Sequence, residues 1–442
     1  MRGISIPKII ALSFIVLILL GAFLLTLPIS SQSGHSIGFV DALFTATSGS
    51  CVTGLSLFDI HSTLTLFGQI VLLVCIQMGG LGLITFAGLV ILSFRRNLGY
   101  QEAQIVKEGL NQSTIEGIRK FILHIFVLVF FIEGAGCLLL FISTVKTLGV
   151  TWTNFYFSIF HAISAFCNAG FSLFSDNLAS QNCNVLEMLT ISGLIILGGL
   201  GFTVLDALWA KIQGKKVKFN ASQKLVIRTT LILLVVGTLL TYLFEFRNPA
   251  TLGPLSEGSK WVAAFFQSVT TRTAGFNSVN IGGLSQASVF LFMILMFVGA
   301  SPGSTGGGIK TTTLGVLVAT LMSVLKNRDK VVIYKRTIPH RVVYGAIAIL
   351  FLSLLFIFII TLLILIVQPT LPFISVLFEV ISAFATVGLS LGITAKLCVV
   401  AKLLIVVTMF IGRIGPITFA LFLTKKGNKS PFEYPEESVI IG

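Results

Sequence analysis

The sequence is short of charge. Asp, Glu, Lys and Arg make up 10% of its 442 residues, whereas a soluble globular protein carries about 25%. Acidic side chains are the scarcer, with 16 against 30 Lys and Arg, and they show no pairing suited to a catalytic acid and base. This composition excludes an ordinary soluble domain and gives no support to an acid–base enzyme.

Residues that ligate metals or form disulfides are also few. The six cysteines show no CxxC spacing and no pairing pattern, and the five histidines are scattered along the chain. Such spacing is not typical of a disulfide framework or a zinc site. We therefore read the cysteines as small apolar residues or as residues beside a pore.

Apolar residues are abundant. They make up 55% of the chain, and the mean hydropathy is +1.00. Several apolar runs exceed the roughly 20 residues that cross a bilayer, which predicts an all-α polytopic membrane protein. The first run, from Pro7 to Pro28, lacks a small-residue cleavage site, so we expect a retained span and not a signal peptide.

The net charge of +14 is concentrated in short segments. Of the 30 Lys and Arg, 22 lie in five segments between or beside apolar blocks: residues 2–8, 95–120, 211–228, 326–341 and 425–429. This is the positive-inside pattern, which places these segments and both termini in the cytoplasm. We expect no nucleic-acid binding, although the basic loops would also suit an acidic cytoplasmic partner.

One motif occurs four times. The stretches FTATSGSCVTGL, FHAISAFCNAGF, FQSVTTRTAGF and FEVISAFATVGL each run from Phe to Gly and an apolar residue. Phe44 to Gly54, Phe160 to Gly170 and Phe378 to Gly388 each span ten residues, whereas the third copy spans ten from Phe265 or nine from Phe266. Copies about 105 to 116 residues apart indicate a fourfold internal repeat.

Each repeat reads as a span, a half-helix, a glycine loop and a second span. The expected first spans are 7–27, 121–145, 225–244 and 342–367; the half-helices are 39–50, 154–167, 260–271 and 373–385; the second spans are 64–94, 186–210, 288–325 and 397–423. The repeats occupy 1–96, 97–216, 217–330 and 331–442. This predicts eight spans and four re-entrant loops.

The half-helices are too short to cross the membrane. An apolar stretch of 10–14 residues is more often re-entrant or buried, and non-helical backbone at membrane depth needs burial or a water-filled cavity. Four such loops around one pseudo-fourfold axis would present carbonyls to a cation, with the negative helix ends facing it. The alternative is that the glycines only form turns or pack helices.

The last span of repeat three is interrupted. Its run VGASPGSTGGGIKTTT contains Pro302 and five glycines, and each such residue is costly in a helix interior. We expect a flexible loop below the filter, over residues 299–310.

The run at 299–310 also resembles a phosphate-binding loop, but it has one extra residue before Lys310 and no preceding strand. We therefore expect no nucleotide on this chain and place Lys310 at the cytoplasmic end of the pathway.

Arg413 lies within the apolar stretch VVTMFIGRIGPITF. An ionisable residue at membrane depth is a functional hypothesis by default. We interpret it as an electrostatic barrier that pairs with the carbonyls of residues 303–308; the alternative is a snorkelling arginine.

Four acids lie near the glycine motifs: Asp41, Asp59, Asp176 and Glu379. They would either concentrate cations at the outer mouth of the pore or only cap helices and solvate loops.

These motifs resemble a known family. VTGL at 52–55, NAGF at 168–171, TAGF at 273–276 and TVGL at 386–389 are similar to the four filter loops of the Trk/Ktr/HKT potassium transporters. The likeness covers nearly the whole chain, including DALFTA at 41–46 and FEYPEES at 432–438, and is closest to the membrane subunit of bacterial Ktr systems.

The resemblance implies a potassium translocation subunit in the bacterial cytoplasmic membrane. It implies a homodimer seated on a separate cytoplasmic ring that binds a regulatory nucleotide, and glycine at the first filter position suggests potassium over sodium. The implied filter residues are Val52, Thr53, Gly54, Asn168, Ala169, Gly170, Thr273, Ala274, Gly275, Thr386, Val387 and Gly388. The implied gate residues are Gly299, Ser301, Pro302, Gly303, Ser304, Thr305, Gly306, Gly307, Gly308, Lys310 and Arg413.

Other functions stay open at this point. A sodium-permeable or sodium-coupled cation transporter fits the same loops. A membrane enzyme would need ionisable residues clustered at membrane depth, and an organic-solute carrier usually has two repeats, often inverted. Four repeats in one orientation, each with a glycine loop, favour an ion pore.

Overall fold

The computed structural model describes residues 6–93, 115–180 and 184–416. The long helices are α1 (Ile6–Thr26), α4 (Leu66–Ser93), α6 (Ile115–Leu148), α10 (Ala221–Glu245) and α14 (His340–Val367). The shorter helices are α2 (Phe39–Ser50), α3 (Ile60–Thr63), α7 (Trp152–Phe166), α8 (Val185–Leu200), α9 (Phe202–Ile212), α11 (Glu257–Thr270), α12 (Gln286–Phe297), α13 (Thr311–Leu325), α15 (Phe373–Ala385) and α16 (Val399–Ile414). Strands β1 (Val332–Ile333) and β2 (Arg336–Thr337) form one antiparallel hairpin.

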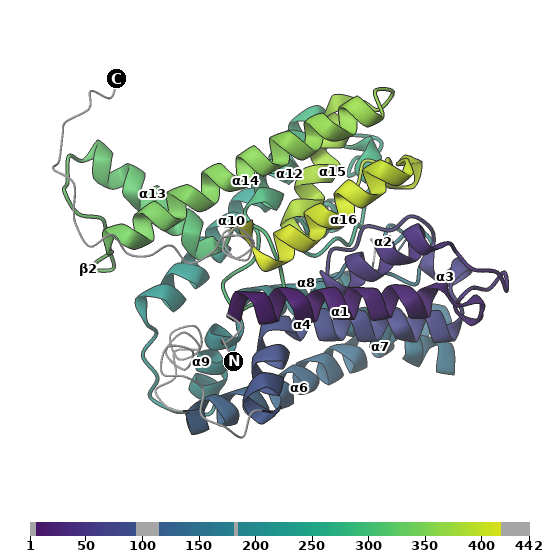
Figure 1. The fold of residues 1–442 in the computed structure, drawn as a ribbon, viewed down its shortest axis with the longest axis horizontal. Coiled ribbons are helices and arrows are strands. Elements are labelled where there is room, and N and C mark those ends of the chain that lie inside the picture. Colours follow the sequence, from purple (N-terminus) through teal and green to yellow (C-terminus); the bar gives the residue numbers. More distant parts are fainter. Residues whose placement is uncertain (1–5, 94–114, 181–183, 417–442) are drawn as a thin grey trace.

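The helices follow the predicted order of span, half-helix and span. α2 and α15 coincide with the predicted half-helices, and α7 and α11 begin two or three residues earlier than predicted. Within each repeat the half-helix packs against its neighbouring spans: α2 against α1 and α4, α7 against α6 and α8, α11 against α10, and α15 against α14 and α16. The long helices run lengthwise through the molecule, with α9 and the hairpin at one end and α3 at the other (Figure 1).

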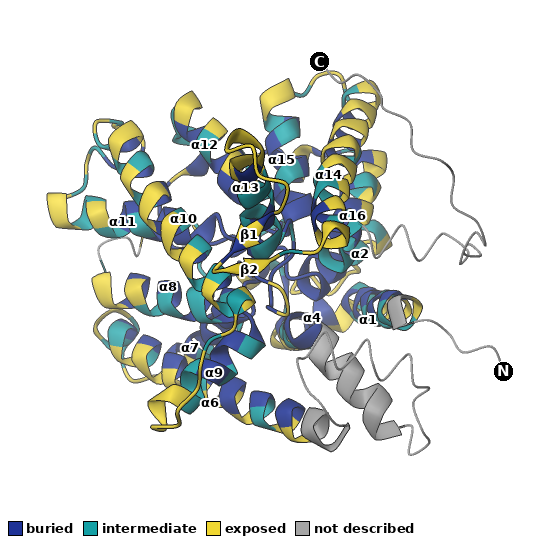
Figure 2. Ribbon diagram, turned by 90° about the vertical axis from the view of Figure 1, so that its left-hand side faces the viewer, coloured by how far each residue is buried: buried dark blue, intermediate teal, exposed yellow. Residues whose placement is uncertain are grey.

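Buried and exposed apolar residues are distributed as expected for a membrane protein. Figure 2 shows the buried residues gathered where the repeats meet, and the exposed ones on the outward faces of the helices. On α14, Phe351, Phe358 and Ile366 are exposed, whereas Ser353 and Thr361 face inward. Because apolar side chains cover the outside and small polar ones line the inside, the outer surface suits lipid.

Within the residues that the structure describes, four helices are long and apolar enough to cross a membrane by length and composition alone: Lys8–Thr26, Lys120–Leu148, Ala221–Glu245 and His340–Val367. The bent pair of α8 and α9 raises this to five if it counts as one span. α12 and α13 are shorter helices on either side of the loop predicted at 299–310. The part of the last predicted span beyond residue 416 lies outside the described residues, so eight spans and the repeat boundaries stay predictions.

One prediction is wrong in the second repeat. Residues 186–210 were expected to form one unbroken span, but α8 and α9 meet at an angle of 111°. Gly201 joins them with a φ of 91°, and the Phe202 amide at the start of α9 donates to the Gly303 carbonyl at 2.8 Å. The loop of repeat three therefore satisfies an amide that the helix break leaves without an intrahelical partner. A contact between residues 101 positions apart, Phe202 and Gly303, cannot be predicted from the local sequence pattern.

Candidate filter and gate at the centre of four repeats

The half-helices α2, α7, α11 and α15 each end at one of the four glycine motifs. In every motif the filter glycine has a positive φ: 94° at Gly54, 69° at Gly170, 79° at Gly275 and 93° at Gly388. The residue two positions earlier also has a positive φ, at Val52, Asn168, Thr273 and Thr386. This backbone is available to glycine at no steric cost and is uncommon for other residues. The same rare conformation at four equivalent places shows that the loops share one shape.

The four glycines lie in a closed ring. A Cβ atom added to Gly54 would lie 2.5 Å from the Ala169 carbonyl oxygen, and one added to Gly170 would lie 2.5 Å from that of Ala274. A Cβ on Gly275 would strike the Val387 carbonyl, and a Cβ on Gly388 would strike the Thr53 carbonyl. Each loop thus abuts the next in chain order, and the fourth abuts the first. The structure brings all twelve predicted filter residues together around one axis.

A hydroxyl on each half-helix ties the loop to its helix. The Gly54 amide donates to Ser48 Oγ at 3.1 Å, and the Gly388 amide donates to Ser382 Oγ at 3.0 Å. In the other two repeats the hydroxyl donates instead: Ser164 Oγ to the Phe171 carbonyl at 2.8 Å, and Thr270 Oγ1 to the Phe276 carbonyl at 2.5 Å. These four hydroxyls are the site residues that sequence reasoning missed, although a Ser or Thr stands four positions after each motif Phe.

The hydroxyls also settle the register of the third motif. Thr270 lies four residues after Phe266, as Ser48 lies four after Phe44. Phe44, Phe160, Phe266 and Phe378 are all fully buried, whereas Phe265 is only partly buried. The third motif therefore starts at Phe266 and is one residue shorter than the others.

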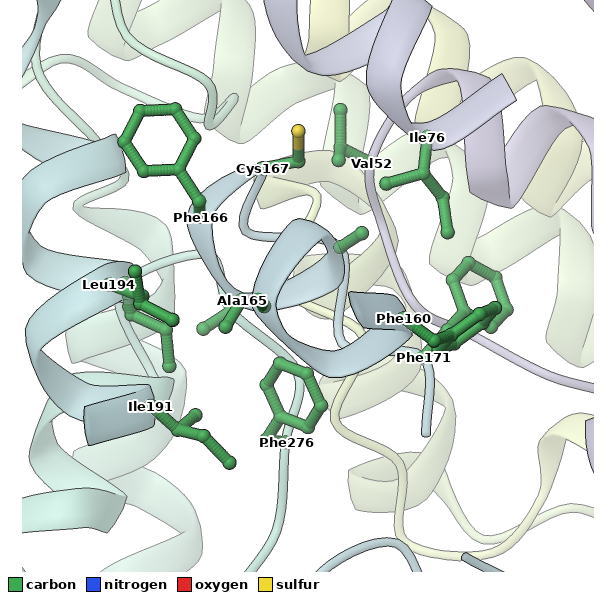
Figure 3. Close-up of a cluster of buried hydrophobic side chains, with 14 of the residues drawn as sticks. Val52, Ile76, Phe160, Ala165, Phe166, Cys167, Phe171, Ile191, Leu194 and Phe276 are labelled. Carbon is green, nitrogen blue, oxygen red and sulfur yellow. The ribbon is translucent and has the colours of Figure 1, made fainter. Parts of the chain in front are cut away.

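Apolar packing holds the loops from behind. Figure 3 shows Val52 of the first loop and Phe276 after the third loop beside the C-terminal half of α7, which contributes Phe160, Ala165 and Phe166. All of these side chains are buried. Because close-packed side chains leave little room for backbone movement, the shell restricts the loops.

A hollow of about 320 Å³ lies on one side of the ring. Gly54, Gly275 and Gly388 line it, together with the side chains or backbone of Asn177, Asn277, Asn280, Ser390 and Thr394. A larger hollow of about 560 Å³ lies away from the ring between α8, α9 and α10, and its lining is apolar apart from Thr230 and Thr238. The polar hollow beside the glycines is the one suited to a hydrated cation.

None of the four acids singled out in the sequence lines the polar hollow. Asp59 caps α3 by accepting from the Ser62 amide at 2.9 Å, and Asp176 accepts from the Ser180 amide at 2.7 Å. Asp41 pairs with Lys402 Nζ of α16 at 2.7 Å, and Glu379 is buried on α15. The contacts of Asp59 and Asp176 are those of helix and turn caps.

The other side of the ring is covered by the loop at residues 299–310. Thr305 Oγ1 donates to the Phe166 carbonyl at the end of α7 at 3.3 Å, and the Gly307 amide donates to Thr386 Oγ1 of the fourth loop at 2.9 Å. A Cβ added to Gly306 would strike Thr273 Oγ1 of the third loop. The loop thus touches three of the four glycine motifs, and its glycines are needed for this close approach.

Arg413 of α16 holds this loop to the first repeat. Its guanidinium donates to the Thr305 carbonyl in the loop, and to the carbonyls of Gly79 and Gly80 on α4, the last at 3.2 Å. It also lies over the Phe14 ring, with 5.8 Å from Cζ to the ring centroid. The fork of the guanidinium donates to several acceptors at once, which a lysine ammonium matches poorly. The two α4 carbonyls were not foreseen, because nothing in the sequence brings residue 413 near residue 79.

Lys310 folds back on the same loop. Its Nζ donates to the Gly306 carbonyl at 2.8 Å, and the residue precedes α13 as its N-cap. The run before it follows helix α12 and not a strand. A phosphate-binding loop follows a strand, so the run differs from that motif in its structural context. Other predicted gate residues bond inside the loop and to its neighbours. Ser304 Oγ donates to the Ser301 carbonyl at 2.6 Å, and Thr311 Oγ1 at the start of α13 donates to Ser301 Oγ at 3.0 Å. The Ser301 amide donates to the Gly199 carbonyl of α8 at 3.1 Å.

Comparison with known proteins covers nearly the whole chain. Residues 7–432 match the model of the TrkH family, whose description is cation transport protein. The chain belongs to this family of cation transport proteins. With its apolar helices, it is a multi-pass membrane transporter, as the sequence predicted.

Relatives in the TrkH family resemble the chain over its full length. It is 40% identical over 438 residues to the Ktr system potassium uptake protein B of Bacillus subtilis (strain 168), covering 99% of this chain and 96% of that protein. It is 37% identical over 448 residues to the potassium/sodium uptake protein NtpJ of Enterococcus hirae, covering 100% of this chain and 98% of that protein. These relatives are transporters, which agrees with the lack of an enzymatic motif in the sequence.

A solved structure confirms the fold class of this TrkH family member. The crystal structure of the potassium transporter TrkH from Vibrio parahaemolyticus superposes with a TM-score of 0.74, covering 96% of this chain and 86% of that one. The two sequences are 18% identical. The all-α membrane fold predicted from the repeats is therefore confirmed.

Proposed function

We propose that this protein takes up potassium across the bacterial cytoplasmic membrane through a four-loop selectivity filter. The observation that carries the proposal is the closed ring formed by Gly54, Gly170, Gly275 and Gly388. A ring of backbone from four loops offers carbonyl oxygens from four sides, and such rings replace the hydration shell of potassium. Relatives named potassium uptake proteins support the choice of ion.

The half-helices strengthen this assignment. The C-terminal end of each half-helix faces the ring, and such an end carries a partial negative charge of roughly half an elementary charge. The twelve residues at 52–54, 168–170, 273–275 and 386–388 form the proposed filter. Potassium enters from the polar hollow of about 320 Å³ beside the ring and leaves toward the loop on the opposite side.

The loop at 299–310 acts as the gate, and Arg413 holds it closed by donating to the Thr305 carbonyl. The loop packs against three filter motifs, and Thr305 and Gly307 bond directly to pore-helix and filter atoms. An ion leaving the ring on this side meets the loop and the Arg413 charge. Conduction therefore requires the loop to move, which breaks the contacts of Thr305 with Arg413.

Regulation comes from another chain. The names of the Ktr relatives refer to a system, which implies a further component in those organisms. We infer for this protein a homodimer bound to a cytoplasmic nucleotide-binding ring, with both termini in the cytoplasm. The basic segments at 211–228 and 326–341 lie on the side that the positive-inside rule assigns to the cytoplasm, where such a partner would dock.

The test is growth and ion uptake in a bacterium that lacks its own potassium uptake systems. Expression of this chain with a regulatory subunit of a Ktr system is expected to restore growth at low potassium and to drive uptake of rubidium as a tracer. Cells carrying the regulatory subunit alone are the control. No growth and no tracer uptake from a chain that reaches the membrane would contradict the proposal.

A second candidate is a transporter that also carries sodium or requires it. The similarity to a potassium/sodium uptake protein of Enterococcus hirae favours this alternative. Uptake measured in proteoliposomes with and without sodium separates the cases. Sodium-independent rubidium flux supports a potassium pathway alone, whereas flux that vanishes without sodium supports coupling.

A further inference from the structure

Three of the four half-helices carry a polar side chain that bonds to a serine beyond the filter. His161 Nε2 lies 2.9 Å from Ser172 Oγ, and Gln267 Nε2 donates to Ser278 Oγ at 3.2 Å. Ser390 Oγ donates to Glu379 Oε2 at 2.7 Å. In each pair the two residues are eleven positions apart, and the polar residue directly follows the motif Phe. We call these contacts the outer braces.

The half-helix end of each brace is buried. His161, Gln267 and Glu379 are 3%, 0% and 1% exposed. Each brace spans the loop between the half-helix and the segment that follows the filter glycine. Because a buried polar group without a partner is costly, the serine hydroxyl has a strong preference for this position.

Two of the braces form part of small networks. His161 Nδ1 lies 2.8 Å from the Phe157 carbonyl, which only accepts, so Nδ1 carries the proton and Nε2 is left as an acceptor. The Leu173 amide donates to that Nε2 at 3.3 Å. Glu379 also accepts from Thr394 Oγ1 at 2.5 Å, and Thr394 and Ser390 are 2.9 Å apart. The Ser390 hydroxyl thus points to a carboxylate, whereas the single Ser172 proton has two acceptors within reach, His161 Nε2 and the Asn177 carbonyl at 3.0 Å.

The first repeat has the same sequence positions but no brace. Thr45 follows Phe44, and Ser56 lies eleven residues after Thr45. Thr45 Oγ1 is buried and has no hydrogen-bond partner among the described residues, and Ser56 Oγ donates to the Phe58 carbonyl at 2.5 Å instead. The threonine side chain is shorter than that of His, Gln or Glu, so it does not reach across the loop.

We propose that the outer braces are positioning contacts that set ion selectivity in the second, third and fourth loops, and that the unbraced first loop is the compliant quarter of the ring. The inference rests on the proposed filter function. All four loops keep the inner tether to a half-helix hydroxyl, but only three are held on both sides of the glycine. Discrimination between cations depends on how firmly the carbonyls keep their distance from the ion.

Four matched variants test this proposal: Ser172→Ala, Ser278→Ala, Ser390→Ala and Ser56→Ala. Each removes one hydroxyl oxygen and adds no volume. The preference for potassium over sodium, measured as the ratio of tracer influx in proteoliposomes, is expected to fall about three- to tenfold when a brace is removed. Ser56→Ala is expected to keep the ratio of the unchanged protein.

A second variant separates positioning from folding. Ser390→Thr retains the hydroxyl and is expected to keep the wild-type flux ratio. Ser390→Ala is expected to lower that ratio, although its thermal stability in detergent stays similar to that of Ser390→Thr. If Ser390→Ala does not fold, the Ser172 and Ser278 variants decide. The proposal is overturned if Ser56→Ala lowers the ratio as much as the brace variants, or if no brace variant changes it.

The result also distinguishes this inference from the proposed function. Suppose that the unchanged protein takes up potassium selectively and that Gly54→Ser alters this selectivity, but that all four serine variants keep the wild-type flux ratio. This outcome would contradict the proposed role of the braces and would still support the filter. No potassium uptake by the unchanged protein removes the filter and the braces together.

Discussion

Arg413 donates to the Thr305 carbonyl, which joins helix α16 of the fourth repeat to the loop of the third. The same guanidinium also donates to the Gly79 and Gly80 carbonyls on α4 of the first repeat. One charged side chain thus connects three repeats at the inner side of the ring. Hydrogen bonds to a charged group contribute about 1.5–3 kcal/mol each, which is enough to hold the loop in its covering position.

Arg413→Ala is expected to raise potassium flux in the absence of the regulatory subunit by about tenfold or more. The substitution removes the donors to Thr305, Gly79 and Gly80, so the covering position of the loop loses stability relative to an open one. Rubidium influx into proteoliposomes containing this chain alone measures the effect. Arg228→Ala, which removes an exposed arginine on α10, is the control for the loss of charge.

Arg413→Lys sharpens this prediction. Lysine keeps the charge but lacks the planar fork that serves several carbonyls at once, so flux is expected to lie between those of the unchanged protein and Arg413→Ala. A lysine variant that behaves like the alanine variant would assign the effect to hydrogen bonding alone. Wild-type flux in both variants would remove Arg413 from the gate.

Gly307→Ala is expected to displace the loop at 299–310 from the ring of four glycine motifs. The added Cβ would lie 2.5 Å from Thr386 Oγ1 and 3.1 Å from the Gly412 carbonyl oxygen, and the second of these contacts is to backbone. Because the backbone cannot rotate away, the loop must move, and flux without the regulatory subunit is expected to rise. Gly345→Ala on α14, where an added Cβ meets nothing within 4 Å, is the control.

The displacement can be measured directly. Hydrogen exchange of the amides in 299–310 is expected to be faster in Gly307→Ala than in Gly345→Ala, because the amide of residue 307 loses its bond to Thr386 Oγ1. Equal exchange in the two variants, together with equal flux, would show that the close approach of this glycine does not hold the loop.

Gly54→Ser is expected to lower the preference for potassium over sodium. Its Cβ would lie 2.5 Å from the Ala169 carbonyl oxygen and 3.2 Å from the Gly170 Cα, so the carbonyls next to it must shift. Gly34→Ser is the matched control: Gly34 also has a positive φ, of 69°, but a Cβ there meets nothing within 4 Å. If Gly54→Ser and Gly34→Ser both lower the preference for potassium, backbone strain at a positive φ is the cause. If Gly54→Ser leaves the preference unchanged, Gly54 is not part of the filter.

Glu245→Gln is expected to destabilise the protein by about 2–4 kcal/mol, through the loss of charged hydrogen bonds and an unmatched buried amide. The Glu245 carboxylate is 1% exposed and accepts from Thr251 Oγ1 at 2.5 Å, Asn248 Nδ2 at 2.6 Å and the Ser285 amide at 2.9 Å. It thereby joins the end of α10 to the start of α12. Thermal unfolding in detergent measures the change.

Glu257→Gln supplies the comparison on the next helix. The Glu257 side chain is 71% exposed in its pair with Lys260, and solvent screening leaves exposed ion pairs with little effect on stability. Its midpoint of unfolding is therefore expected to stay close to that of the unchanged protein. Equal losses in the two glutamate variants would contradict the distinction between the buried and the exposed carboxylate.

Much of the fold could be predicted from the sequence because it is encoded locally. Apolar runs of sufficient length predict helices, and glycine motifs at matching positions predict the loops between them. The half-helices 39–50 and 373–385 were predicted to the residue, since a proline or glycine precedes each one and a glycine motif follows. The cytoplasmic side assigned from the basic segments stays a prediction; it rests on the cost of placing charge inside a bilayer.

The sequence by itself determined that four alike loops exist; only the tertiary structure decided what they touch. The order of the ring, the register of the third motif at Phe266, and the bend at Gly201 all depend on contacts between residues about 100 or more positions apart, or on which of two adjacent side chains is buried. The same holds for Arg413, whose partners lie on α4 and in the loop. The local sequence pattern reflects which side chains favour lipid and which favour water. The long-range contacts of Arg413, of Gly201 and of the ring glycines form only when the four repeats come together around one axis.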